Sequence, residues 1–454
     1  MFTIFIVYVM LSYIQPGQVL PALAPYHLTF WVGVAGLAVA IWSPARRVEL
    51  LANLQLWALV VFTAALAVSL IIAERWLGAP ILAIQKFGPS LTIFVLALCS
   101  VTSIAQLRVA AYGVVVLTMA LLLQGAAAYH FGYNTRLFLH DRHASSEAVA
   151  AAVEDDDADS DADAVDDAVG DSADEDEWQE SLRIQGLGFM QDPNDLALGM
   201  IVALGLIGGA WNDQRRSHLA LFAAGAAALM YGIYLTRSRG GAVALVVVLW
   251  RIAASRIGRG PAFLLLVALG AGLMVLDFGG RSLAMQLDES ASGRLVAWTE
   301  GLDMLKAHPL LGVGYGQFLE YHPLTAHNSL VLCFAETGLL GCFFWVGLIV
   351  VTFLELGTLK NLAGDDPFDH TVRQWAEGLQ MALIGFIAAA FFLSRTFVPT
   401  LYLIIGLAAA LAVIARQSGR SIPLPPLPLL ALIVLACEVG GIGLVYAIVK
   451  LQLA

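Results

Sequence analysis

Long apolar runs without charge are the feature that most constrains this chain. Residues 50–73, "LLANLQLWALVVFTAALAVSLIIA", contain no charged side chain, and about 20 such residues in a helix cross the hydrocarbon core of a bilayer. Charged residues make up 13% of the sequence, whereas soluble domains hold about 25%. Because the runs are continuous and do not alternate as barrel strands do, the spanning elements must be helices. The sequence predicts an all-α integral membrane protein.

Apolar runs between polar breaks mark the expected membrane segments. Together they predict about 12 to 13 transmembrane helices, of which the 327–356 run is long enough to be tilted or interrupted. The runs lie near residues 3–15, 28–42, 50–73, 88–101, 106–129, 194–211, 218–235, 241–254, 261–278, 327–356, 376–394, 397–415 and 427–449. We interpret the first run as a spanning helix, because it lacks the basic start and small-residue cleavage site of a signal peptide.

One insertion carries the acidity of the chain. Residues 154–177 hold fourteen acids and no Lys or Arg, so the rest of the chain is mildly basic, at +3, although the whole has a net charge of −11. Such a tract cannot bury a core and is expected to be disordered. An EF-hand needs Gly at position 6 and Glu at position 12, but counting from Asp157 these are Ala162 and Ala168. We interpret the tract as a solvated insertion without a catalytic role.

The distribution of Lys and Arg indicates the orientation. Short cytoplasmic loops collect these residues, and with the N-terminus inside, the inner loops hold twelve of the 24. Loops 130–193 and 279–326 then lie together on the outer face. The predicted organisation is N-terminal helices in 1–129, an outer loop in 130–193, central helices in 194–278, an outer catalytic loop in 279–326, and C-terminal helices in 327–454.

Two polar clusters on the predicted outer face precede transmembrane helices. Residues 183–200, "RIQGLGFMQDPNDLALGM", include Arg183 and Asn194, and the Asp-Pro-Asn triplet is also typical of a simple helix cap. Residues 235–243, "LTRSRGGAV", place Arg237 and Arg239 between two apolar runs. These arginines suit either anchoring at the membrane surface or a guanidinium fork that holds a phosphate.

Two further clusters follow in the second outer loop. Residues 292–318 predict an amphipathic surface helix that starts at Ser292 or Gly293, with Arg294 in its first turn, and ends at Pro309. Alternate glycines then predict a tight non-helical turn. The next stretch, "TAHNSL", places His327 and Asn328 at the mouth of a membrane helix, with Glu336 about two turns deeper. A histidine is often structural, but this position favours a base.

The order of these motifs resembles the O-antigen ligase/polymerase family. The motifs are DPN (192–194), SRG (238–240), GR-x3-W (293–298), HP-x2-G-x-G-x-G-x-F (308–318), HNS (327–329), E-x-G-x2-G (336–341) and "RTFVPTLYLIIGLAAA" (395–410). The resemblance covers roughly residues 180–415. It implies a GT-C-like, multi-pass enzyme of the bacterial inner membrane with its active site facing the periplasm.

The resemblance also implies the reaction and the residues that carry it. The donor would be a glycan linked to undecaprenyl pyrophosphate, and the acceptor a glycan or lipid A-core. Arg239 and Arg294 match the family's pyrophosphate-binding arginines and His327 its candidate base. Arg237, Arg183, Asn194, Asn328 and Glu336 are expected to bind substrate. No metal, other cofactor or nucleic acid is expected, because electrostatic stabilisation by two guanidinium groups serves the leaving group.

The sequence leaves alternatives open. A ligase and a polymerase use the same chemistry and differ only in the acceptor, although the His-Asn element favours the ligase type. A secondary transporter would also line its path with charges in broken helices, but the halves of this chain show no obvious repeat and the polar groups gather on one face. A glycan-binding scaffold without catalysis is a third possibility.

Overall fold

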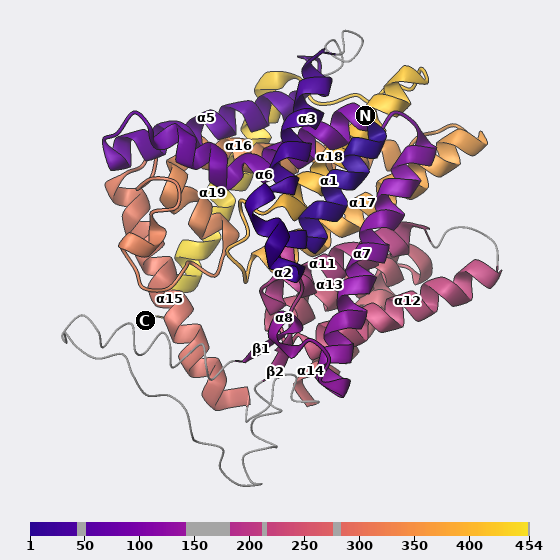
Figure 1. Cartoon of the computed structure of the whole chain (residues 1–454), viewed down its shortest axis with the longest axis horizontal. Helices are drawn as coiled ribbons and strands as arrows, with labels where there is room; N and C mark the ends of the chain where they lie inside the picture. The colour runs from indigo at the N-terminus through magenta and orange to yellow at the C-terminus, as the bar shows by residue number, and fades with distance from the viewer. Residues whose placement is uncertain (43–50, 142–181, 211–215, 276–282, 453–454) are drawn as a thin grey trace.

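The computed structural model describes residues 1–42, 51–141, 182–210, 216–275 and 283–452, and nearly all of its regular structure is helical (Figure 1). The acidic tract 154–177 lies outside these ranges. The helices are α1 Phe2–Ile14, α2 Pro16–Val19, η1 Pro21–Tyr26, α3 Leu28–Trp42, α5 Leu54–Glu74, α6 Ala79–Ser100, α7 Ile104–Phe131, α8 Thr135–Phe138, η2 Gly188–Met190, α11 Pro193–Ala210, α12 Arg216–Leu235, α13 Arg239–Ile257, α14 Arg259–Val275, α15 Leu283–Ala307, η3 Phe318–Glu320, α16 Ser329–Lys360, α17 Pro367–Ala390, α18 Pro399–Gln417 and α19 Leu427–Gln452.

Each of the thirteen apolar runs predicted from the sequence overlaps a helix, although α6 and α17 begin nine residues earlier than predicted, at Ala79 and Pro367. Eight helical segments within the described residues are long and apolar enough to cross a membrane, and shorter apolar helices lie at 193–209, 223–235 and 259–268. The prediction of an all-α protein that crosses the membrane several times is therefore confirmed.

The ends of the helices form two opposite faces of the bundle. Hydrogen bonds bring the ends of α1, α12 and α17 and the starts of α11, α13 and α16 together on one face, which we call the site face. In the lower half of Figure 1, α2, α8, β1, β2 and α15 lie toward this face. A short antiparallel sheet of β1 (Leu139–Asp141) and β2 (Leu182–Ile184) is built here, with Leu139 opposite Ile184.

The core of the bundle is formed by α11, α17 and α18. Of the best membrane-spanning window in α18, 83% is buried inside the protein. Small residues let α11 and α17 approach closely: a Cβ added to Gly209 would lie 2.3 Å from the Cα of Gly378. Close backbone contact through small residues is how helices associate in lipid, where apolar burial gives little driving force.

Helix α16 is interrupted at Gly338, as the length of the 327–356 run suggested. Gly338 has φ 63° and ψ −169°, a combination that essentially only glycine adopts. The backbone groups released at this kink pair with residues 309–314 of the preceding loop. Leu339 N donates to Pro309 O at 2.8 Å, and Val313 N donates to the carbonyl of Ala335 at 2.9 Å. The loop thus completes the hydrogen bonding of the broken helix.

The amphipathic helix of the second outer loop differs from the prediction at its start. Helix α15 begins at Leu283, nine residues before Ser292, and ends at Ala307. Arg294 therefore lies in the middle of the helix and not in its first turn. Residues 283–292, "LAMQLDESAS", hold good helix formers and no Gly or Pro, so the helix continues back through them.

Candidate active site

Arg239 begins helix α13 at the site face. The hydroxyl of Ser238 caps the helix by accepting a hydrogen bond from Gly241 N at 3.1 Å. The preceding residue, Arg237, has φ 50° and stacks its guanidinium on the ring of Tyr234, at 5.0 Å from the ring centre. A cation at the positive end of a helix dipole is electrostatically unfavourable, so this corner of the site is suited to an anion.

Arg183 and Asn194 brace the turn that holds Arg239. Arg183 Nε donates to the carbonyl of Thr236 at 2.7 Å, and its Nη2 lies 3.2 Å from Asn194 Oδ1. The same amide oxygen accepts from the Ser238 hydroxyl at 2.8 Å. The structure thus ties β2 and the start of α11 to the turn between α12 and α13. For both residues, a role in positioning Arg239 is directly supported by these contacts.

Helix α15 brings Arg294 and Trp298 to the site on one face, one turn apart. Trp298 is buried, its ring packs edge-on against Phe391, and its Nε1 donates to the carbonyl of Ala326 at 3.0 Å. Arg294 is half-buried, and burial together with the nearby positive charge of Arg239 lowers its pKa. Arg239 and Arg294, from separate helices, therefore come together.

His327 lies between two fixed neighbours. Ala326 is held by Trp298, and Asn328 caps α16 through its side-chain oxygen, which accepts from Leu330 N at 2.9 Å and Val331 N at 3.2 Å. His327 itself has φ 49°. A left-handed backbone is uncommon for a residue with a side chain and gathers at functional sites, where the surroundings impose it.

The imidazole of His327 lies in a positively charged environment. Burial lowers its pKa, and the charges of Arg294 and Arg395 lower it further, while Asp192 acts in the opposite direction. An imidazole is unprotonated above its ordinary pKa of about 6.5. A ring with a lowered pKa is therefore neutral at pH 7 and able to accept a proton.

Arg395 is a member of the cluster that the sequence analysis did not single out. Its guanidinium forms an ion pair with Asp195 and lies 3.7 Å from Asp192. Its backbone N donates to the Ser329 hydroxyl at 2.8 Å, and that hydroxyl donates to the carbonyl of Leu393 at 2.6 Å. The 391–396 segment is thus fastened to the start of α16. The acidic partners of Arg395 lie about 200 residues earlier in the chain, so sequence spacing gave no signal beyond the "RTFVPT" motif.

Glu336 fixes the glycine turn. Its buried carboxylate accepts from Gly316 N at 2.9 Å and from Phe318 N at 3.3 Å. Gly312, Gly314 and Gly316 all have positive φ, of 69°, 116° and 77°, so the predicted tight non-helical turn is present. These contacts support a role for Glu336 in holding the turn, while its contact with substrate stays a prediction.

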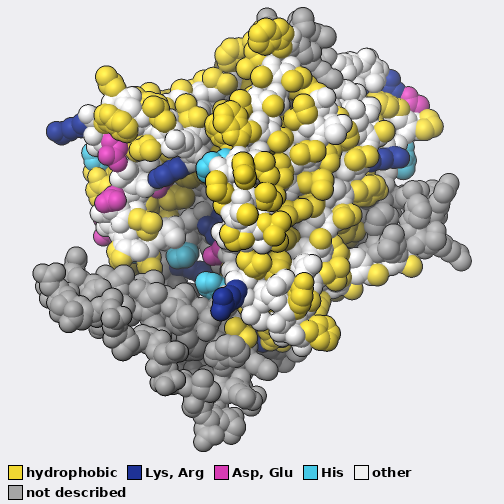
Figure 2. Space-filling model, in the orientation of Figure 1, with side chains coloured by type: hydrophobic (Ala, Val, Ile, Leu, Met, Phe, Trp, Pro, Cys, Tyr) yellow, Lys and Arg dark blue, Asp and Glu magenta, His cyan; other side chains and the backbone are white. Residues whose placement is uncertain are grey.

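The site as a whole combines guanidinium groups, a neutral imidazole and apolar walls. Figure 2 shows a hollow in one face, between the regions of α15 and α2 in Figure 1, where Lys or Arg, His and acidic side chains gather amid a mostly hydrophobic surface. Such an arrangement at the end of a membrane bundle suits an anionic head group on a lipid. The fold and site define a multi-pass membrane protein with a candidate anion-binding catalytic centre.

Comparisons with known proteins agree with the motifs. Residues 223–346 match the family model described as O-antigen ligase. The chain is also 30% identical over 153 residues to the exopolysaccharide production protein ExoQ of Rhizobium meliloti (strain 1021), a match that covers 30% of this chain and 33% of that protein. Both findings support the O-antigen ligase/polymerase family, and the resemblance predicted from the motifs is confirmed.

Proposed function

We propose that this protein transfers a glycan from undecaprenyl pyrophosphate to an acceptor hydroxyl, in the bacterial inner membrane and with the site face toward the periplasm. The observation that carries the proposal is the position of Arg294 between the other two residues: the charge of Arg239 lowers the pKa of Arg294, and the charge of Arg294 lowers the pKa of His327. Two guanidinium groups can stabilise the charge of the leaving pyrophosphate, and a neutral imidazole can accept the proton of the acceptor hydroxyl. The family's O-antigen ligase description supports the ligase type.

In the proposed reaction, the acceptor hydroxyl attacks the anomeric carbon and gives its proton to the His327 imidazole. A new glycosidic C–O bond forms while the bond between the anomeric carbon and the pyrophosphate oxygen breaks. Arg239 and Arg294 stabilise the negative charge that develops on the departing undecaprenyl pyrophosphate. Burial strengthens this stabilisation, because the local dielectric constant is lower than that of water.

Chain extension is a second candidate, in which the acceptor is itself a lipid-linked glycan. The similarity to ExoQ, which is named for exopolysaccharide production, favours it. The chemistry at His327 would be unchanged. The product distinguishes the two: a ligase gives capped acceptors, and a polymerase gives long glycans that remain on the carrier.

The test is transfer by purified protein in proteoliposomes that contain the lipid-linked donor and an acceptor. Arg239→Ala, Arg294→Ala and His327→Ala are each expected to lower kcat by about 100-fold or more, with unchanged folding by thermal melting. Arg136→Ala is the matched control, because Arg136 is exposed on α8 of the same face. Ordinary transfer by the three site variants would refute the assignment, and solute uptake without transfer would favour a transporter.

A further inference from the structure

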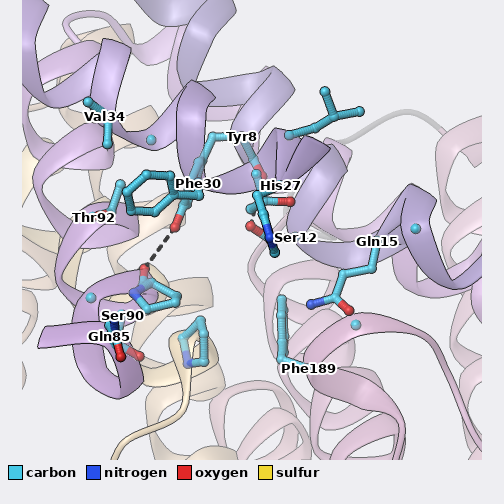
Figure 3. Close-up of a pocket in the computed structure, with 18 of the residues that line it drawn as sticks. Tyr8, Ser12, Gln15, His27, Phe30, Val34, Gln85, Ser90, Thr92 and Phe189 are labelled. Atoms are coloured by element: carbon cyan, nitrogen blue, oxygen red, sulfur yellow. Dashed lines mark hydrogen bonds between the residues drawn. The ribbon is translucent and has the colours of Figure 1, made fainter. Parts of the chain in front are cut away.

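A second cavity lies beside the candidate active site, between α1, η1, α3 and α6. It has a volume of about 830 Å³, within the range of small-molecule and cofactor sites. In Figure 3, Gln85 and Ser90 of α6 stand on one side, and Gln15 and Phe189 stand on the other. Tyr8 reaches across from α1 and donates to the carbonyl of Pro89 at 3.3 Å, as the dashed line in Figure 3 marks.

The wall of this cavity toward α3 is apolar and open. Phe30, Val34 and Ile84 line it with exposed fractions of 61%, 42% and 57%. Helix α3 belongs to a membrane-spanning segment of which only 17% is buried inside the protein. Because these side chains would face lipid, the opening suits a hydrocarbon chain that enters sideways from the bilayer.

The other lining of the cavity is polar and holds a cation. Ser12, Thr92, His27 and Lys86 contribute to it. A Cβ added to Gly316 would lie 3.1 Å from Lys86 Nζ, so the ammonium group sits beside the glycine turn that Glu336 holds. Lys86 is exposed, and an exposed ammonium at the end of an apolar groove suits a phosphate on a lipid.

The cavity and the candidate active site share a wall. Pro399 lines the cavity and follows Arg395 by four residues, and the carbonyl of Phe397 accepts from Ser90 Oγ at 2.6 Å. On the other side, Phe189 lines the cavity, while Asp192, three residues later, lies beside Arg395. A glycan that extends from the cavity past this wall would point toward His327.

We propose that this cavity binds the acceptor, a glycan carried on a phosphate-bearing prenyl lipid. The prenyl chain lies over Phe30, Val34 and Ile84, Lys86 contacts the phosphate, and the glycan hydroxyl reaches His327. This inference rests on the proposed function and deepens its second candidate, chain extension, in which the acceptor is itself a lipid-linked glycan. Arg239 and Arg294 remain with the donor, so the enzyme holds two lipid heads side by side.

The first test measures transfer against acceptor concentration at saturating donor. Val34→Trp, which fills the cavity, and Lys86→Gln, which removes the cation, are each expected to raise the KM for a lipid-linked acceptor about tenfold or more, with the donor KM unchanged. Val39→Trp and Lys450→Gln are the matched controls, since neither residue lines the cavity. Ile84→Trp replaces Val34→Trp if that variant does not fold. An unchanged acceptor KM in both cavity variants would overturn the proposal.

The second test does not depend on activity. A sugar-free polyprenyl pyrophosphate with a photoreactive group in its chain is cross-linked to the full chain in phosphatidylethanolamine nanodiscs. The Arg239→Ala background removes part of the donor site. We expect labelled peptides from α3 and α6, lost in Val34→Trp and kept in Val39→Trp, even if no transfer is detected. Labelling that Val34→Trp leaves intact, or that phosphatidylglycerol competes away equally well, would refute the acceptor site.

Discussion

Trp298 and Ala326 connect the surface helix to the segment that carries His327. The indole Nε1 of Trp298 donates to the Ala326 carbonyl at 3.0 Å, and both residues are buried. Arg294 lies one turn before Trp298 on the same face of α15. One hydrogen bond therefore links the helix that carries Arg294, a candidate phosphate-binding residue, to the segment that carries His327, the candidate base.

Trp298→Phe tests this connection. The substitution keeps an aromatic ring against Phe391 but leaves the Ala326 carbonyl without its donor, at a cost of about 1–3 kcal/mol in the free energy of unfolding. We expect kcat to fall about tenfold or more, because His327 loses its alignment, with little change in the donor KM. Trp57→Phe, which removes a similar bond to Leu51 O far from the site, should keep full activity.

The pH dependence of transfer should report the charges around His327. The lowered pKa of its imidazole places the acidic fall in kcat below pH 6.5, its ordinary value. Arg294→Gln removes a positive neighbour and should move this fall to higher pH in the residual activity. Asp192→Asn removes a negative neighbour and should move it to lower pH. Shifts of the same sign in both variants, measured by pH–rate profiles, would show that another group titrates.

Gly338→Ala should disrupt the kink in α16. The added Cβ would meet the carbonyl carbon of Leu310 at 2.3 Å, and the backbone there has φ 63°. We expect a loss of about 3 kcal/mol or more in the free energy of unfolding, seen as a lower melting temperature in detergent or as poor accumulation in the membrane. Gly440→Ala, where nothing lies within 4 Å of the added atom, should leave the melting temperature unchanged or higher.

A double-mutant cycle should give a larger coupling energy for the Arg395–Asp195 ion pair than for an exposed surface pair. Its side chains are only 20% and 15% exposed, so removal of one partner leaves a charge poorly solvated. We expect a coupling of about 1–3 kcal/mol between Arg395→Gln and Asp195→Asn in thermal melts. The Lys306–Asp303 pair, with side chains 67% and 54% exposed, should give a much smaller coupling. Equal couplings would contradict a structural role for Arg395.

The approximate positions of the long apolar helices could be predicted from the sequence, because each contains one continuous apolar run between polar breaks. The conformation of the glycine turn was also predictable, since alternate glycines cannot sustain a helix. The contact that holds the turn could not be predicted, because Glu336 and Gly316 are 20 residues apart and no periodicity relates them. Loop contacts depend on tertiary packing, which local patterns do not encode.

The candidate site was predictable where a short polar motif interrupts the apolar sequence. Arg239, Arg294 and His327 each stand in a short polar motif, and the structure brings them together, while their chemical roles stay predictions. Arg395 was missed because its significance lies in contacts with Asp192 and Asp195. The predicted start of helix α15 was too late because Ser292 and Gly293 resemble a helix cap. No Gly or Pro in residues 283–292 interrupts the helix before them.

The backbone hydrogen bonds between residues 309–314 and the kink in α16 restrict where the sequence of this protein can change. A cut, an affinity tag or a longer linker within 309–314 would strip hydrogen-bond partners from the interior of the bundle, and damage would spread well beyond the surface. Insertions and large substitutions should therefore be tolerated better elsewhere along the chain. Engineered variants of the protein should keep this stretch unchanged.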